Sequence, residues 1–246
     1  MKKLKYLSVL TTLVSSIALA DEAGEWSYDK ELGPAHWAQL NSKYASCSGL
    51  NQSPINIDKT IKSELEPLKF DYKDQATVKD IVNLGHTVQV NFEAGAKLIV
   101  DGKTFNLKQF HLHTPSENLI KGKQYPLEMH MVHVSDDGEL AVIGVMFDEG
   151  KSNISLAKVM ADFPRKSGDV KVPQSKIIAS DFLITKQAYY RFNGSLTTPP
   201  CTEGVRWLVM KDIQQASKEQ IKAFSDSIGH SNSRPVQKIG ARPILE

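Results

Sequence analysis

The sequence has no marked excess of charge of either sign. The formal net charge is only +2, and no basic stripe or arginine-rich arm indicates nucleic-acid binding. Aromatic residues are scarce at 8%, but a hydrophobic fraction of 41% is enough for one substantial core. No internal repeat, low-complexity tract or long linker divides the chain. The composition therefore predicts one domain that does not bind nucleic acid.

The chain also lacks an apolar run long enough to cross a membrane comfortably. The apolar stretch at residues 6–19 is too short for a span, and it follows three lysines within the first five residues. It ends in the sequence A-L-A at residues 18–20, a small-residue cleavage site. We predict a signal peptide at residues 1–20 and a mature protein at residues 21–246, exported to the periplasm or secreted. An uncleaved membrane anchor is the alternative.

Cysteine is scarce as well, since the chain has only Cys47 and Cys201. An even number of cysteines in an exported protein predicts one disulfide. The two residues are far apart and do not form a C-x-x-C motif, which argues against zinc ligation by them. Two free thiols are the alternative.

Short strand-like runs, many of them alternating, dominate what is present. They predict strands at residues 65–72, 77–83, 87–92, 98–100, 104–113, 127–135, 140–147, 187–192 and 205–210. Turns at residues 101–102 and 136–138 join neighbouring strands into hairpins. Helical spacing occurs at residues 153–163 and after Ser217, where S-K-E-Q forms a capping box. The pattern predicts a strand-dominated α+β domain with a few peripheral helices.

Two histidines on one predicted strand, His111 and His113, are separated by one residue. Side chains on a strand alternate between its two faces, so both imidazoles point the same way. Two rings on one face can share a metal ion. A buried pair with satisfied hydrogen bonds is the alternative, because one H-x-H motif is a weak signal.

A second predicted strand carries two histidines of opposite orientation. Alternation places His130 on one face with Glu128, and His133 on the other face with Met129 and Met131. Methionines suit a packed core, so His130 is the candidate ligand and His133 a buried structural histidine. Three histidine ligands with a fourth position open are typical of a catalytic zinc site.

The segment N-G-S-L-T-T-P-P at residues 193–200 predicts a stiff turn that could hold a hydroxyl in a fixed place. Cys201 follows directly, so a disulfide would tie this turn to the segment around Cys47. A fixed hydroxyl near a metal can orient a bound hydroxide if an acceptor takes its own proton, and Glu117 is a candidate for that acceptor. An ordinary surface turn is the alternative.

Taken together, these segments resemble the α-class carbonic anhydrases, and specifically their exported bacterial members. The resemblance covers residues 26–235 and rests on the segments WSYDKELGPAHW, NQSPINI, NLGHTVQV, QFHLHTPSE, PLEMHMVH, YRFNGSLTTPPCTEGVRW and NSRPVQ, in family order. It implies one catalytic domain around a large, mostly antiparallel central β-sheet. It also implies zinc-dependent, reversible hydration of carbon dioxide to bicarbonate and a proton.

The resemblance implies a zinc centre and the groups that orient it. His111, His113 and His130 resemble the zinc ligands, in agreement with the alternation argument. The acceptors that fix two of these rings would be Gln109 and Glu128, each two residues upstream of the ligand that it holds.

Catalytic residues are implied in the same way. Thr197 resembles a gatekeeper that accepts a hydrogen bond from zinc-bound hydroxide and passes its own proton to Glu117. Thr198 resembles a second hydroxyl in the site, and His86 resembles the proton shuttle. The apolar wall for carbon dioxide would consist of Val132, Val142, Leu196, Val205 and Trp207. The shuttle's water network would be held by Tyr28, Asn83 and Gln89, and cis peptide bonds are implied at Ser53-Pro54 and Pro199-Pro200.

Two positions depart from the family pattern. Leu112 replaces an aromatic residue between the two histidines, and Asn118 replaces a histidine, which puts hydrogen bonding around Glu117 in doubt. A secreted zinc esterase or hydrolase on the same scaffold is the second functional hypothesis. A non-catalytic binding module is the third, and the three retained histidines argue against it. The oligomeric state is left open, with a homodimer as one option.

Overall fold

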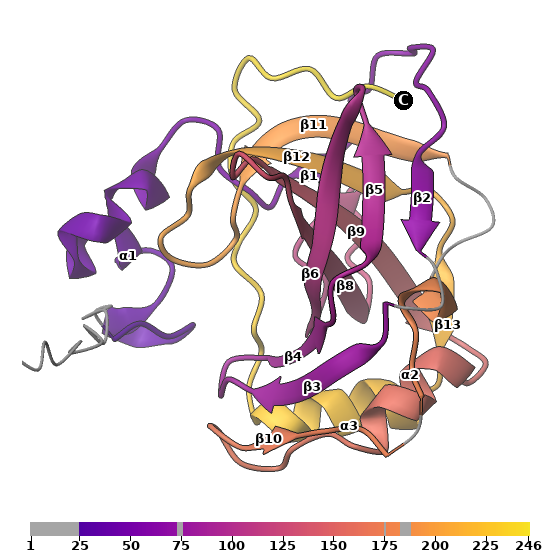
Figure 1. Cartoon of the computed structure of the whole chain (residues 1–246). Coiled ribbons are helices and arrows are strands. Elements are labelled where there is room, and N and C mark those ends of the chain that lie inside the picture. Colours follow the sequence, from indigo (N-terminus) through magenta and orange to yellow (C-terminus); the bar gives the residue numbers. More distant parts are fainter. Residues whose placement is uncertain (1–24, 73–75, 175, 183–187) are drawn as a thin grey trace, which may run out of the picture.

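A computed structural model describes residues 25–72, 76–174, 176–182 and 188–246 (Figure 1). The predicted signal peptide at residues 1–20 lies outside these residues, so the signal peptide and the start of the mature domain stay predictions. Within the described part of the chain, no helix is both long and apolar enough to span a membrane.

One large sheet of eleven strands forms the centre of the described structure (Figure 1). Its strands are β2 (Lys69–Tyr72), β3 (Val78–Asn83), β4 (Val88–Phe92), β5 (Ala96–Val100), β6 (Lys103–His113), β8 (Leu127–Val134), β9 (Leu140–Glu149), β10 (Val170–Lys171), β11 (Tyr189–Ser195), β12 (Glu203–Met210) and β13 (Gln214–Ala216). The main path runs β10-β3-β4-β6-β8-β9-β12-β11; β5 joins β6 to β2, and β13 pairs with β9. The pairs are antiparallel except those of β9 with β12 and β13. The predicted α+β fold around a mostly antiparallel sheet is therefore confirmed.

The helices are short and peripheral, as predicted. They are α1 (Trp37–Leu40), α2 (Ile154–Met160) and α3 (Lys218–Ile228), with 3-10 turns η1 (Lys30–Leu32), η2 (Ser42–Ser48) and η3 (Ala179–Phe182). The capping box is present, because Ser217 accepts from the backbone of Gln220 and the Gln220 side chain accepts from Ser217 in return. A separate two-stranded sheet pairs β1 (Asn56–Ile57) with β7 (Leu119–Ile120).

The alternation of side chains divides the core into two faces of the sheet. Met129 and Met131 of β8 lie in the larger apolar cluster, together with Phe105 of β6. Trp207 of β12 belongs to a second cluster, and Val132 of β8 packs against it. His133 lies on the methionine side, fully buried, and contacts the Met131 carbonyl oxygen and the Tyr72 hydroxyl. The predicted orientation of β8 is thus confirmed.

Two sequence predictions differ from the structure at strand ends. The strand expected at residues 65–72 begins only at Lys69, because Pro67 has no backbone N–H to donate to a ladder. The turn expected at residues 193–200 begins later, since β11 continues through an irregularity at Gly194 and ends at Ser195. A Cβ at Gly194 would lie 2.1 Å from the Ser53 hydroxyl oxygen, so the strand passes too close for a side chain.

The predicted Cys47–Cys201 disulfide is present, and the described chain has no free cysteine. It ties η2 to the loop before β12 and sits in a small cluster with Trp37 and Tyr44. The two expected cis peptide bonds, at Ser53-Pro54 and Pro199-Pro200, are also present. A third at Thr114-Pro115 was not predicted.

Removal of this disulfide should be one of the most destabilising single changes outside the site. The bond joins residues 154 positions apart, and the chain-entropy model gives about 5 kcal/mol for so long a loop. We expect Cys201→Ser to lower the free energy of unfolding by about 3–5 kcal/mol in urea titrations. Cys47→Ser and the double variant should lose the same amount, because all three remove one bond. Losses that add in the double variant would contradict this account.

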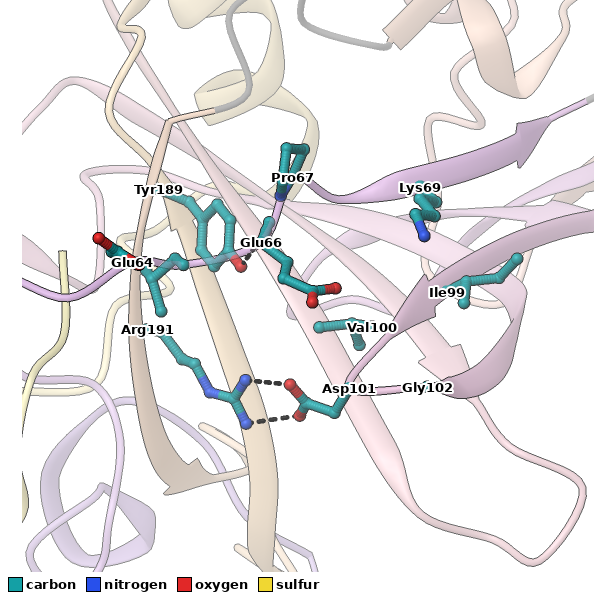
Figure 2. A pocket seen from close by; sticks show the side chains of 11 residues that line it. Glu64, Glu66, Pro67, Lys69, Ile99, Val100, Asp101, Gly102, Tyr189 and Arg191 are labelled. Carbon is teal, nitrogen blue, oxygen red and sulfur yellow. Dashed lines mark hydrogen bonds and ion pairs between the residues drawn. The ribbon is translucent and has the colours of Figure 1, made fainter.

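An ionic network lies at the turn between β5 and β6. The Arg191 guanidinium pairs with both oxygens of Asp101, beside a cavity of about 470 Å³ (Figure 2). Arg206 also contacts Asp101 and links it to Glu139. No predicted site residue lines this cavity, so the cavity is not the candidate site.

Candidate metal centre

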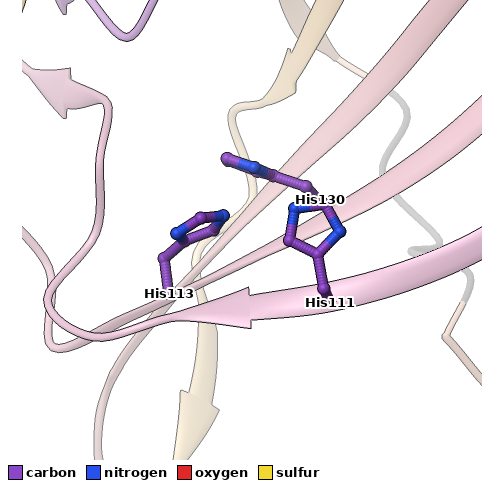
Figure 3. Close-up of side chains that lie close together, drawn as sticks. All are labelled: His111, His113 and His130. Carbon is purple, nitrogen blue, oxygen red and sulfur yellow. The ribbon is translucent and has the colours of Figure 1, made fainter. Parts of the chain in front are cut away.

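Three histidine rings converge on one face of the sheet. His111 and His113 come from β6, and the antiparallel register sets His111 opposite His130 of β8. The ring centroids are 4.5–5.4 Å apart, and Figure 3 shows the three rings grouped around one space. One nitrogen from each ring lies within 4.8 Å of the other two. The described residues therefore contain a group close enough to share a metal ion, as the alternation argument predicted.

The second nitrogen of each ring lies within 3.0 Å of an oxygen atom of the protein. His111 Nδ1 lies 2.9 Å from Gln109 Oε1, and His130 Nε2 lies 3.0 Å from Glu128 Oε1. His113 Nδ1 lies 2.8 Å from the backbone oxygen of Asn232. A ring nitrogen that faces an acceptor carries the proton, so the other nitrogen keeps its lone pair for a metal.

The donor set fits a zinc ion. His113 Nε2 is buried and has no hydrogen-bond partner among the described residues, which is costly unless a ligand occupies that direction. Burial, with the neighbouring His130 as a smaller cause, holds the pKa of His111 and His113 well below the usual value. Neutral imidazoles are the form that binds metal. For His130, burial lowers the pKa, but the Glu128 carboxylate outweighs it and the net shift is upward.

Thr197 and Glu117 meet beside the histidines. Thr197 is buried in the loop after β11, where its hydroxyl lowers the pKa of Glu117, and the Arg234 backbone N–H donates to Glu117 Oε1 at 2.8 Å. Glu117 Oε2 is 3.4 Å from His113 Nε2. Burial raises the pKa of Glu117 to about 7, while His130, Thr197 and the Arg234 N–H oppose that rise. The predicted hydroxyl therefore lies near enough to its predicted acceptor to affect the pKa of that carboxyl.

The residues predicted to form the apolar wall come from separate elements. Trp207 contacts the His130 ring, with centroids 4.8 Å apart. The remaining members, from β8, β9, β12 and the loop after β11, belong to or pack against the same apolar cluster: Val132, Val142, Leu196 and Val205. Thr198 lies partly exposed in that loop, next to Thr197.

A family model described as eukaryotic-type carbonic anhydrase matches residues 32–246. The chain belongs to the α-carbonic anhydrases. A carbonic anhydrase of Pectobacterium atrosepticum is 44% identical over 229 residues, covering 93% of each chain. One of Neisseria gonorrhoeae is 41% identical over 246 residues, covering 99% of this chain and 96% of that one. The predicted family and enzyme class are confirmed.

Solved α-carbonic anhydrase structures share the fold over most of the chain. That of Photobacterium profundum is 51% identical with a TM-score of 0.85, covering 90% of this chain and 100% of that one. That of Thermovibrio ammonificans, in complex with the inhibitor sulfanilamide, is 42% identical with a TM-score of 0.88, covering 91% and 99%.

His86, the shuttle candidate of this α-carbonic anhydrase, is half-buried near the start of β4. Its ring packs against Trp26, with centroids 4.7 Å apart. Burial lowers its pKa to about 4. The Tyr28 ring also contacts Trp26, and Gln89 lies opposite His111 in the β4–β6 pair.

Asn83, expected in the shuttle's water network, is placed differently by the structure. Its side chain is buried, with the amide nitrogen donating to the backbone oxygens of Pro164 and Ser227. Its oxygen accepts from the Gly85 backbone. The amide therefore holds the turn before His86, and the prediction that it binds shuttle water is wrong.

Two residues of the site were missed by sequence reasoning. Asn232 orients His113 through its backbone oxygen, and Arg234 holds Glu117 through its backbone N–H at 2.8 Å. Both lie in the NSRPVQ segment that supported the family resemblance, and this was the signal that could have pointed to them.

Proposed function

We propose that the chain catalyses the reversible hydration of carbon dioxide to bicarbonate and a proton, with Zn²⁺ held by His111, His113 and His130. The observation that carries the proposal is the set of three rings, each with one nitrogen within 3.0 Å of a protein oxygen and the three rings grouped closely enough to share a metal ion. When bound, Zn²⁺ supplies a Lewis acid that lowers the pKa of a coordinated water and makes it nucleophilic near neutral pH.

The Thr197–Glu117 pair would orient the nucleophile. The Thr197 hydroxyl has one proton, and a hydrogen bond to the neighbouring Glu117 carboxyl would use that proton. Its oxygen is then left as an acceptor, so it can bind only a group that donates. A nucleophile that donates a hydrogen bond to Thr197 has its lone pair turned toward the substrate.

The apolar wall would hold carbon dioxide beside that lone pair. Carbon dioxide is uncharged, so side chains such as Val142 and Trp207 can hold it without a charged partner. The same side chains exclude competing water from the face of the nucleophile. An apolar wall favours this substrate over the larger, more polar esters of the alternative hydrolase.

The main test is stopped-flow carbon dioxide hydration with and without a zinc chelator. Activity should follow bound zinc, vanish in the metal-free chain and return when zinc is restored. Zinc-loaded protein that leaves carbon dioxide untouched but cleaves esters would favour the hydrolase. Inactive protein that binds no zinc would favour the binding module.

His86 would carry the proton from the site to solvent. Packed against Trp26, the His86 ring has a pKa of about 4, which is too low for it to accept a proton at neutral pH. We therefore infer that the ring leaves this position during turnover. A more hydrated imidazole regains a pKa suited to the relay.

Replacing His86 with alanine should lower kcat by roughly tenfold while changing kcat/KM much less, because proton release follows the step that consumes carbon dioxide. Stopped-flow measurements in a bulky buffer would show this split. Adding imidazole as a small proton carrier should restore part of kcat. Equal losses in kcat and kcat/KM would rule out the shuttle role.

Export to the periplasm or the medium is also part of the proposal. It is supported by the disulfide, which persists in oxidising compartments. Mass spectrometry of protein recovered from outside the inner membrane should find Asp21 as the first residue.

A homodimer stays a prediction that size-exclusion chromatography with light scattering would test.

A further inference from the structure

The Glu128 carboxylate is fully buried, and it accepts three hydrogen bonds and makes one close contact with a histidine nitrogen. Its Oε2 accepts from the backbone N–H groups of Glu117 at 2.8 Å and Asn118 at 2.9 Å. Its Oε1 accepts from the Asn118 side-chain amide at 2.8 Å and lies 3.0 Å from His130 Nε2. Buried charge is tolerated only with such compensation, so these donors fix the position of the Glu128 carboxylate.

Asn118 is the only side chain besides His130 among the donors recorded for this carboxylate in the described residues. Its amide orientation is fixed, because Oδ1 accepts from the backbone N–H of Ile55 at 3.0 Å. The opposite end, Nδ2, is therefore directed at Glu128. The family departure at this position was expected to disturb Glu117, but the Asn118 side chain bonds Glu128 instead.

We propose that Asn118 is a positioning residue for the metal centre. Its amide holds Glu128 Oε1 against His130 Nε2, which keeps the proton on that nitrogen and leaves Nδ1 free. The inference rests on the proposed zinc site. It adds one group to that site, because Asn118 orients Glu128, and Glu128 orients the ligand His130.

Asn118→Asp tests the proposal because it keeps the side-chain size and removes only the N–H donor. The new carboxylate can still accept from Ile55, but it faces Glu128 Oε1 with a second negative charge. The two like charges repel each other, so Glu128 Oε1 should move away from His130 Nε2. This displacement weakens the hold on His130, so zinc should bind about 10–100-fold more weakly, the range found for outer-shell partners.

Gln220→Glu is the matched control. The Gln220 amide is also buried, donates to the Asn153 backbone oxygen at 2.7 Å and accepts from the Asn153 backbone N–H at 2.8 Å. It lies in the first turn of α3, and no contact between it and the three histidines is recorded in the described residues. Zinc affinity, measured by competition with a chelator, should be unchanged in this variant even if it unfolds at a lower temperature.

A double-mutant cycle shows whether Asn118 acts through Glu128. In a Glu128→Gln background the carboxylate is already gone, so adding Asn118→Asp should change zinc affinity by less than about threefold. Asn118→Ser, which removes the amide without adding charge, replaces Asn118→Asp in the same cycle if the latter does not fold. The inference would be overturned if Asn118→Asp lowered zinc affinity equally in the wild-type and Glu128→Gln backgrounds. It would also be overturned if the single variant bound zinc as tightly as the wild type.

The unmodified chain separates this inference from the proposed function. If it bound no zinc, the metal centre itself would be wrong and the inference would fall with it. If it bound zinc tightly and the Asn118 variants bound it equally well, only the positioning role would be wrong.

Discussion

Replacing His130 with alanine should abolish tight zinc binding and, with it, carbon dioxide hydration. The substitution removes one of three converging nitrogens and leaves the buried Glu128 carboxylate without its imidazole partner. Loss of an outer-shell partner alone weakens metal binding by about 10–100-fold, so loss of a ligand should exceed that range. Zinc per chain after dialysis against a weak chelator, measured by atomic emission, gives the result directly.

His133→Ala is the control on the same strand. His133 lies on the opposite face, in contact with Tyr72 and the Met131 backbone, and contributes nothing to the metal centre. Its removal should cost about 1–3 kcal/mol of stability through lost hydrogen bonds and packing, while zinc content stays at the wild-type level. If His133→Ala lost the metal and His130→Ala kept it, the assigned orientation of β8 would be wrong.

Thr197→Val should lower kcat/KM by roughly 100-fold or more, a size typical of losing one positioned hydrogen-bonding group at a reacting centre. Valine keeps the shape of threonine but has no hydroxyl to contact Glu117 or to accept from the nucleophile. Zinc content should not change, since Thr197 is not among the clustered ligands. Stopped-flow kinetics normalised to bound zinc would measure the effect.

A wild-type kcat/KM in Thr197→Val would remove Thr197 from the mechanism. A loss that disappears after normalisation to bound zinc would assign Thr197 a structural role in metal retention instead. Thr202→Val serves as a comparison, because it changes a hydroxyl at the end of the same loop without touching Glu117.

The sequence predicted the metal centre well because the decisive information is local. Alternation along a strand depends only on residue spacing, and it oriented His111, His113 and His130 before any contact was known. The disulfide could be predicted equally well from the sequence, since a chain with two cysteines allows only one intramolecular pairing.

Contacts made by backbone groups were not predictable in this way. The Asn232 oxygen meets His113 across 119 residues, and the Arg234 N–H meets Glu117 across 117. Every residue offers a backbone oxygen, so residue type carries no signal for such a contact. Asn83 failed for a related reason: an amide beside a turn can bond the backbone or face solvent, and only the surrounding chain decides which.

The pairing of β6 with β8 limits how the length of this part of the chain can change. Because neighbouring side chains face opposite ways, inserting one residue within β8 would turn His130 into the apolar core and bring Met129 or Met131 to the metal. An insertion of two would restore the face but displace the imidazole by roughly 7 Å along the strand. The turn at residues 135–139 lies beyond this pairing, so it can gain or lose residues without moving a single ligand. Natural length variation should therefore accumulate in that turn and be absent from the two strands.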